Sequence, residues 1–208
     1  MIPLPDKKYS IIYADPPWGY QNRGTRAAAN KHYDVMTVED IKRMGVGAAG
    51  GGGIANDDCA LFMWATFPML KEALDVIEAW GFTYKTVAFN WVKQNKNGAG
   101  LFMGLGNWTR SNSEICLLAV KGKPKRVSAS VHSVILSPLQ QHSQKPGEAR
   151  DRIVELMGDL PRIELFARET APGWDSWGNE VPTPAECEET NGQQTDRGGH
   201  EAEAAGQV

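Results

Sequence analysis

Apolar residues gather in five short runs along the chain, separated by glycine, proline and polar residues. The first run is rich in isoleucine and tyrosine and ends at a pair of prolines. Short apolar runs with these residue types and boundaries predict buried strands. The expected strands are residues 9–14, 59–64, 83–92, 114–120 and 162–167.

Three segments between these runs carry helix signals, over residues 37–44, 68–81 and 146–158. Thr37 is followed three residues later by Asp40, in the manner of a capping box. In the other two segments, apolar residues recur at helical spacing until Gly81 and Gly158 end the pattern. Strands that alternate with helices predict an α/β fold with a mostly parallel sheet and helices on both faces.

Two glycine-rich segments interrupt this pattern. Residues 45–53 are almost all glycine and alanine, and no Lys-Ser or Lys-Thr follows, which argues against a phosphate-binding loop. We expect a flexible insert over residues 45–56. Residues 95–112 are polar, are punctuated by glycine and are expected to form a loop.

The size and composition are those of one folded domain with a tail. The chain has 208 residues, of which 41% are hydrophobic, enough for a sizeable core. Residues 181–208 show no apolar periodicity and hold six acidic residues and one arginine, which predicts an acidic, disordered tail. The net charge is −3 overall and −5 for the tail, which leaves +2 on residues 1–180. A weakly basic domain permits a nucleic-acid partner without requiring one.

The sequence shows no apolar run of about 18 residues and no signal-peptide pattern, so we expect neither a membrane span nor secretion. Cys59, Cys116 and Cys187 are widely spaced, and neither they nor the histidines have the spacing of metal ligands. We expect reduced cysteines, no metal and a cytoplasmic location.

The candidate chemistry begins at Asp15-Pro16-Pro17-Trp18, directly after the first expected strand. Each proline fixes its own φ and holds the preceding residue extended. Open α/β sheets bind ligands beyond the carboxyl ends of their strands. Because proline has no N–H, the segment offers acceptors that suit the exocyclic amine of a nucleobase, and Trp18 offers a ring for stacking. The alternative is an ordinary Asp-Pro turn with a buried tryptophan.

Four motifs resemble those of one family, in the same order. Asp15-Pro16-Pro17-Trp18 resembles the catalytic motif of adenine amino-methyltransferases, the family of the eukaryotic messenger-RNA N6-adenosine methyltransferase. Gln-His-Ser-Gln-Lys-Pro at residues 141–146 resembles its His-x-x-Gln-Lys-Pro signature. Residues 163–168 resemble its cofactor strand, and residues 173–180 its C-terminal signature. The resemblance covers about residues 9–180 and is greatest to compact bacterial and phage members.

This resemblance implies an adenine N6-methyltransferase that uses S-adenosylmethionine, with a Rossmann-like methyltransferase domain over residues 1–180. The catalytic motif precedes the cofactor strand, which implies the permuted order of that fold. The implied catalytic residues are Asp15, Pro16, Pro17 and Trp18. The implied cofactor-binding residues are Asp15, Pro16, Lys145, Glu164, Phe166, Arg168, Asn179 and Glu180.

The resemblance gives Lys145 a charge-assisted contact with the cofactor's carboxylate. The alternative is a solvated lysine near a helix start. For Glu164 and Arg168 the alternative is an exposed ion pair at a strand end.

The implied substrate-binding residues are Trp18, Tyr33, Trp108 and Glu114. Apart from the resemblance, the basic charge of Lys123, Lys125 and Arg126 suggests that they contact phosphates. Tyr33 could equally be a loop aromatic packed on the core, and the basic run a solvated turn.

We expect DNA as the substrate of a bacterial or phage-encoded protein, with RNA as the alternative. A cytosine methyltransferase is disfavoured, because its motif usually begins with serine. A non-catalytic nucleic-acid-binding subunit is disfavoured, because the catalytic acid and the stacking ring are both present. A homodimer and an accessory subunit both stay open.

Overall fold

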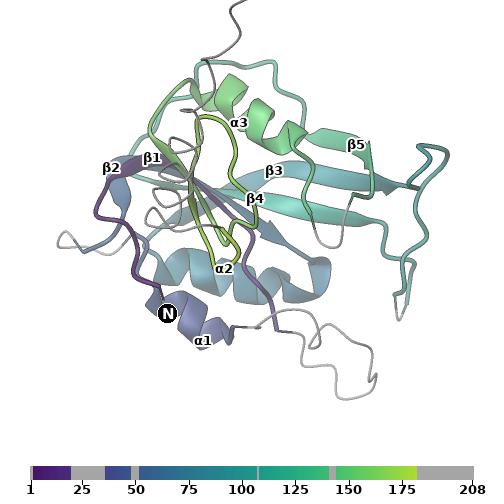
Figure 1. The fold of residues 1–208 in the computed structure, drawn as a ribbon, viewed down its shortest axis with the longest axis horizontal. Helices are drawn as coiled ribbons and strands as arrows, with labels where there is room; N and C mark the ends of the chain where they lie inside the picture. The colour runs from purple at the N-terminus through teal and green to yellow at the C-terminus, as the bar shows by residue number, and fades with distance from the viewer. Residues whose placement is uncertain (1, 20–35, 48–51, 107, 141–143, 182–208) are drawn as a thin grey trace, which may run out of the picture.

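The computed structural model describes residues 2–19, 36–47, 52–106, 108–140 and 144–181. In these residues the strands form one seven-stranded sheet in the order β5-β3-β4-β2-β1-β6-β7 (Figure 1). The strands are β1 Tyr9–Ala14, β2 Ala55–Ala65, β3 Thr83–Gln94, β4 Ser113–Lys121, β5 Val134–Pro138, β6 Arg162–Leu165 and β7 Asp175–Trp177.

The direction of β4 determines which segments meet at each edge of the sheet. β4 runs antiparallel to both of its neighbours, whereas the pairs β1–β2, β1–β6, β3–β5 and β6–β7 are parallel. The described strands other than β4 therefore all end at one edge. β4 begins at that edge and ends at the opposite one.

Helices cover both faces of the sheet. α1 Val38–Arg43, the 3₁₀ helix η2 Phe67–Met69 and α2 Leu70–Ala79 lie on one side, and α3 Glu148–Met157 lies on the other (Figure 1). The side chain of Thr37 accepts a hydrogen bond from the Asp40 N–H, which confirms the predicted cap of α1. Ile41, Val76 and Ile77 are buried in one apolar cluster, and Ala149 and Ile153 in a second cluster on the α3 side.

The predicted fold class, α/β with a mostly parallel sheet, is confirmed. Two strands, β5 and β7, were not predicted. The last predicted strand ends early, at Leu165, because Phe166 has a positive φ of 61°.

The predicted insert over residues 45–56 is too wide at both ends. Val46 is fully buried, and its carbonyl accepts hydrogen bonds from the Ile54 and Ala55 N–H groups at 2.9 and 3.1 Å. β2 begins at Ala55. Residues 48–51 and residues 182–208 of the predicted tail lie outside the described residues, so flexibility there stays a prediction.

Candidate active site

The Asp15–Trp18 segment lies at the sheet edge where the parallel strands end. The Asp15 N–H donates to the Leu165 carbonyl at 3.4 Å, which joins the segment to the end of β6. The Trp18 N–H donates to the Pro16 carbonyl at 2.8 Å and closes a tight turn over the two prolines. The Asp15 carboxylate stands at the start of this turn.

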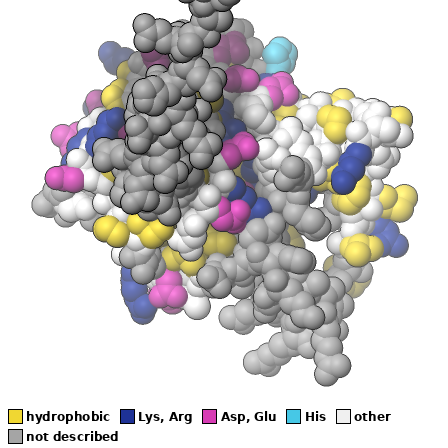
Figure 2. All heavy atoms as spheres, in the orientation of Figure 1, with side chains coloured by type: hydrophobic (Ala, Val, Ile, Leu, Met, Phe, Trp, Pro, Cys, Tyr) yellow, Lys and Arg dark blue, Asp and Glu magenta, His cyan; other side chains and the backbone are white. Residues whose placement is uncertain are grey.

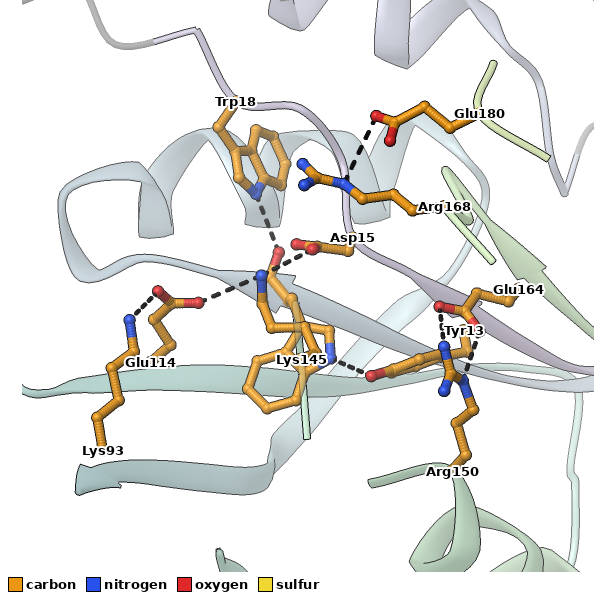
Figure 3. Close-up of polar contacts among 11 residues, drawn as sticks. Tyr13, Asp15, Trp18, Lys93, Glu114, Lys145, Arg150, Glu164, Arg168 and Glu180 are labelled. Carbon is orange, nitrogen blue, oxygen red and sulfur yellow. Dashed lines mark hydrogen bonds and ion pairs between the residues drawn. The ribbon is translucent and has the colours of Figure 1, made fainter. Parts of the chain in front are cut away.

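Four charged side chains of alternating sign form a row at this edge (Figure 3). Lys145 Nζ lies 2.7 Å from Asp15 Oδ2 and 3.4 Å from Glu114 Oε2. Lys93 Nζ bonds to the other carboxylate oxygen of Glu114. The Lys145 side chain is only 10% exposed, so the alternative of a solvated lysine is wrong.

Burial and pairing together set the ionisation of this row. Burial raises the pKa of Asp15, and Lys145 opposes that rise only in part. Burial alone would also raise the pKa of Glu114, but Lys145 and Lys93 outweigh burial and lower the pKa of that carboxyl. Burial would lower the pKa of Lys145, but Asp15 and Glu114 outweigh it and raise it. Burial thus favours the neutral form of Asp15, whereas the two lysines favour the ionised form of Glu114.

Trp64, at the end of β2, supports the row. Lys145 Nζ lies 5.7 Å from the centre of the Trp64 ring, within the range of a cation–π contact. The Trp64 indole N–H donates to the Tyr13 hydroxyl at 2.6 Å. The Trp64 carbonyl accepts from the Trp18 indole N–H at 3.0 Å. One buried residue thus positions Lys145 through its ring and Trp18 through its backbone carbonyl.

Trp18 lies against the core in this structure. It is 8% exposed and belongs to the apolar cluster that includes Ile12 and Met63. The turn over the prolines directs the ring back toward β2, where its N–H finds a partner. The buried-tryptophan alternative therefore describes this structure, and stacking of Trp18 on a base stays a prediction.

The backbone segments at the ends of β6 and β7 meet at a closely packed junction, where the cofactor residues were predicted. The Ala167 N–H donates to the Trp177 carbonyl at 2.9 Å. A Cβ on Gly178 would lie 2.2 Å from the Ala167 carbonyl oxygen, so only glycine permits this approach. The Phe166 ring meets Trp177 edge-on, with 5.6 Å between centroids. The positive φ of Phe166 carries a cost of about 1–3 kcal/mol, and such strain is typical of functional sites.

Polar groups stand beside this junction. Arg168 Nε lies 3.8 Å from Glu180 Oε1, and their side chains are 31% and 52% exposed. Asn179 is exposed next to them. These three predicted residues therefore lie together, whereas Glu164 does not join them.

Glu164 instead pairs with α3. Both of its oxygens accept from the Arg150 guanidinium, at 2.6 and 3.1 Å, and its side chain is 10% exposed. Burial raises the pKa of Glu164 although Arg150 opposes it. The alternative of an exposed Glu164–Arg168 pair is wrong, because each residue has a different partner. Cofactor binding by Glu164 stays a prediction.

The structure brings one predicted substrate residue, Glu114, into the ionic row. Trp108 is fully exposed on the loop between β3 and β4, which leaves the same sheet edge. Leu105, 94% exposed, and Met103, 72% exposed, lie on the same loop. Figure 2 shows hydrophobic side chains together with basic ones on the part of the molecule where Figure 1 draws this loop and β5. Tyr33 lies outside the described residues.

Lys123, Lys125 and Arg126 do not lie at this edge, and their contact with phosphates stays a prediction. They follow β4, which runs antiparallel and ends at the opposite sheet edge. Ile115 pairs with Ala65 near the site, and Lys121 pairs with Cys59 at the far end. The two pairs are six steps apart along the strand, or about 20 Å.

The predictions missed three residues that build the site: Lys93, Trp64 and Arg150. A single lysine or tryptophan near a strand end, or a single arginine on a helix, carries no distinguishing pattern. Their roles depend on strand direction and on partners 21, 51 and 14 residues away. The one available signal was the Glu114 carboxylate, which as a buried charge required a cation.

Comparison with known proteins identifies the family. The MT-A70 family model matches residues 9–180. The chain is 36% identical over 199 residues to the type II methyltransferase M.MunI of Mycoplasma sp. That alignment covers 86% of this chain and 80% of M.MunI. The chain is 27% identical over 178 residues to the N(6)-adenosine-methyltransferase catalytic subunit METTL3 of Homo sapiens, covering 84% of this chain and 28% of METTL3.

A third relative is the N(6)-adenine-specific methyltransferase METTL4 of Homo sapiens, 28% identical over 191 residues, with 84% of this chain and 38% of METTL4 covered. The chain belongs to the MT-A70 family, and the predicted family is confirmed. In the described residues, no helix is long and apolar enough to cross a membrane.

Proposed function

We propose that this member of the MT-A70 family transfers a methyl group from S-adenosylmethionine to the N6 amine of adenine in DNA. The observation that carries the proposal is the contact between Asp15 and Lys145. These residues are 130 positions apart, and two motifs of the predicted family supply them. Their ion pair lies where a parallel α/β sheet binds its ligands.

Asp15 would hold the adenine amine. The amine is a weak nucleophile, because its lone pair is delocalised into the ring. Hydrogen bonds from its N–H groups to the Asp15 carboxylate and the Pro16 carbonyl favour the pyramidal, attacking form. They also stabilise the positive charge that develops on nitrogen. The Pro16 carbonyl already accepts from the Trp18 N–H, and its second lone pair serves the amine.

The residues present fit S-adenosylmethionine. The cofactor carries an amino group, a carboxylate and ribose hydroxyls, and this edge offers both a carboxylate and cations. Lys145 and Asp15 would hold the amino-acid end. Arg168, Asn179 and Glu180, beside the Gly178 junction, would hold the nucleoside end. When bound, the cofactor supplies a methyl group on a positively charged sulfur.

The choice of DNA depends on the higher similarity to a bacterial enzyme. The chain is 36% identical to the type II methyltransferase M.MunI and 27% identical to METTL3. The name of METTL3 specifies adenosine and that of METTL4 specifies adenine, which supports adenine as the methylated base. RNA is the second candidate, because adenosine is a ribonucleoside and METTL3 aligns over 84% of this chain.

Transfer of a labelled methyl group to single- and double-stranded DNA and to RNA tests the proposal, with mass spectrometry for 6-methyladenine. Asp15→Asn removes the charge with little change of shape and should lower kcat at least about 100-fold. Cofactor affinity measured by calorimetry should fall much less than kcat, because Lys145 keeps its contact with the amino-acid end of the cofactor. Asp6→Asn, at an exposed carboxylate, is the control. Full turnover in Asp15→Asn would refute the mechanism, and methylation of RNA alone would replace DNA as the substrate.

A cytoplasmic protein that acts alone or as a homodimer is the simplest form of the proposal. Light scattering of the purified, active enzyme distinguishes these from a requirement for an accessory subunit.

A further inference from the structure

Lys93 occupies an anchored position at the end of β3. Its N–H donates to the Asn112 carbonyl, and its carbonyl accepts from the Phe102 N–H, both at 2.8 Å. Its side chain is 16% exposed and bonds to Glu114, which is 17% exposed. A lysine loses considerable side-chain entropy when held in this way, so the arrangement requires a compensating gain.

The gain lies in the charge balance of the row. Lys145 faces two carboxylates, at 2.7 Å from Asp15 and 3.4 Å from Glu114. One ammonium cannot fully compensate two buried negative charges. Lys93 supplies the second positive charge and places it on the side of Glu114 away from Asp15 (Figure 3). Lys145 is thereby left closer to Asp15.

We propose that Lys93 is a positioning residue that acts through Glu114 and Lys145 to keep the Asp15 carboxylate ionised and aimed at the amine. The inference rests on the proposed function, in which that carboxylate binds the amine. Lys93 contacts neither Asp15 nor the proposed site of methyl transfer. Its influence passes along the row of side-chain contacts.

The direction of the effect follows from the groups that face Asp15. Lys145 and Arg168 lower the pKa of Asp15, while burial and Glu114 raise it. Asp15 in turn raises the pKa values of Glu164 on β6, Tyr13 on β1 and Cys116 on β4. Without Lys93, Glu114 would draw Lys145 toward itself, and the pKa of Asp15 would rise.

Methyl transfer by Lys93→Met over a range of pH tests this reasoning. The acid limb of kcat should move up by about one pH unit, which lowers kcat on that limb about tenfold. The KM for the cofactor should change less than kcat on the acid limb, because Lys93 itself is expected to touch no ligand. Lys93→Arg should restore the wild-type profile. Lys85→Met changes an exposed lysine on the same strand and is the matched control.

The Glu114→Gln background separates this pathway from general damage. If Lys93 acts through Glu114, the double variant should match Glu114→Gln in its acid limb and in kcat to within about twofold. A further loss in the double variant would overturn the proposal. An unmoved acid limb in Lys93→Met would overturn it as well.

Carboxyl ¹³C NMR provides a readout that needs no turnover, with Asp15→Asn to assign the signal. The Asp15 titration should move to higher pH in Lys93→Met and not in Lys85→Met. An unmoved titration refutes the inference even if the wild-type protein methylates DNA. A shifted titration in a protein without methyl transfer refutes only the proposed function.

Discussion

The ion pair between Arg150 and Glu164 offers the sharpest prediction of stability. Both carboxylate oxygens of Glu164 bond to one guanidinium, and the two side chains are 17% and 10% exposed. Arg150→Met keeps the apolar part of the side chain and removes the charge. Glu164 then stays buried without its cation, so the free energy of unfolding should fall by about 3–5 kcal/mol at pH 7.5.

The loss of unfolding free energy in Arg150→Met should grow as the pH rises. Burial already raises the pKa of Glu164, and removal of Arg150 would raise it further. A carboxyl whose pKa is higher in the folded state than in the unfolded state binds more protons when folded, so stability falls as pH rises between those two pKa values. Protonation of Glu164 at low pH removes the uncompensated charge. The loss in Arg150→Met should therefore be smaller at pH 5 than at pH 7.5.

Urea denaturation at both pH values, followed by tryptophan fluorescence, measures this difference. Lys71→Met is the control. Lys71 forms an i,i+4 ion pair with Asp75 at 3.2 Å, and its side chain is 83% exposed. Its replacement should lower the free energy of unfolding by less than about 0.5 kcal/mol. The double variant Arg150→Met/Glu164→Leu should regain most of the lost stability, because it removes both charges. An equal loss at both pH values, or a loss below about 1 kcal/mol at pH 7.5, would refute the argument.

Three further predictions follow from single contacts. Gly178→Ala places a Cβ 2.2 Å from the Ala167 carbonyl oxygen and should weaken cofactor binding about tenfold or more, measured by calorimetry; unchanged affinity would remove the junction from the cofactor site. Thr37→Ala removes the N-cap of α1 and should lower the free energy of unfolding by about 1 kcal/mol in urea, whereas Thr37→Ser should retain it. The triple change of Lys123, Lys125 and Arg126 to Ala should leave kcat within about twofold, because these residues lie about 20 Å from the site edge, and a large loss of kcat would contradict the strand register.

The sequence predicted those parts of the fold whose signals are local. The Tyr9–Ala14 run, the Thr37 cap and the helix before Gly81 were recognised because periodicity and end signals suffice for them. β5 was missed because its apolar run, Val134-Ile135-Leu136, is only three residues long and is soon followed by Pro138. β7 was missed because it is only three residues long.

The site was predictable to the extent that motifs carry it. Asp15, Glu114 and Lys145 were identified and do meet. Lys93 was not identified, because its role depends on the pairing of β3 with β4. Glu164 was identified, but its bond to Arg150 depends on the packing of α3 against the sheet.

The direction of β4 explains why Glu114 lies at the site edge and the basic run after β4 does not. Glu114 and Lys121 lie at opposite ends of the same strand, and no local signal says which end faces the site. A parallel β4 would bring the lysines and arginine that follow it to the catalytic edge, with a surplus of positive charge beside Asp15. The antiparallel strand brings one carboxylate instead, and Lys145 and Lys93 balance it. The orientation of one strand thus determines that Asp15 lies in a row of zero net charge, where the loss of any one member shifts the others.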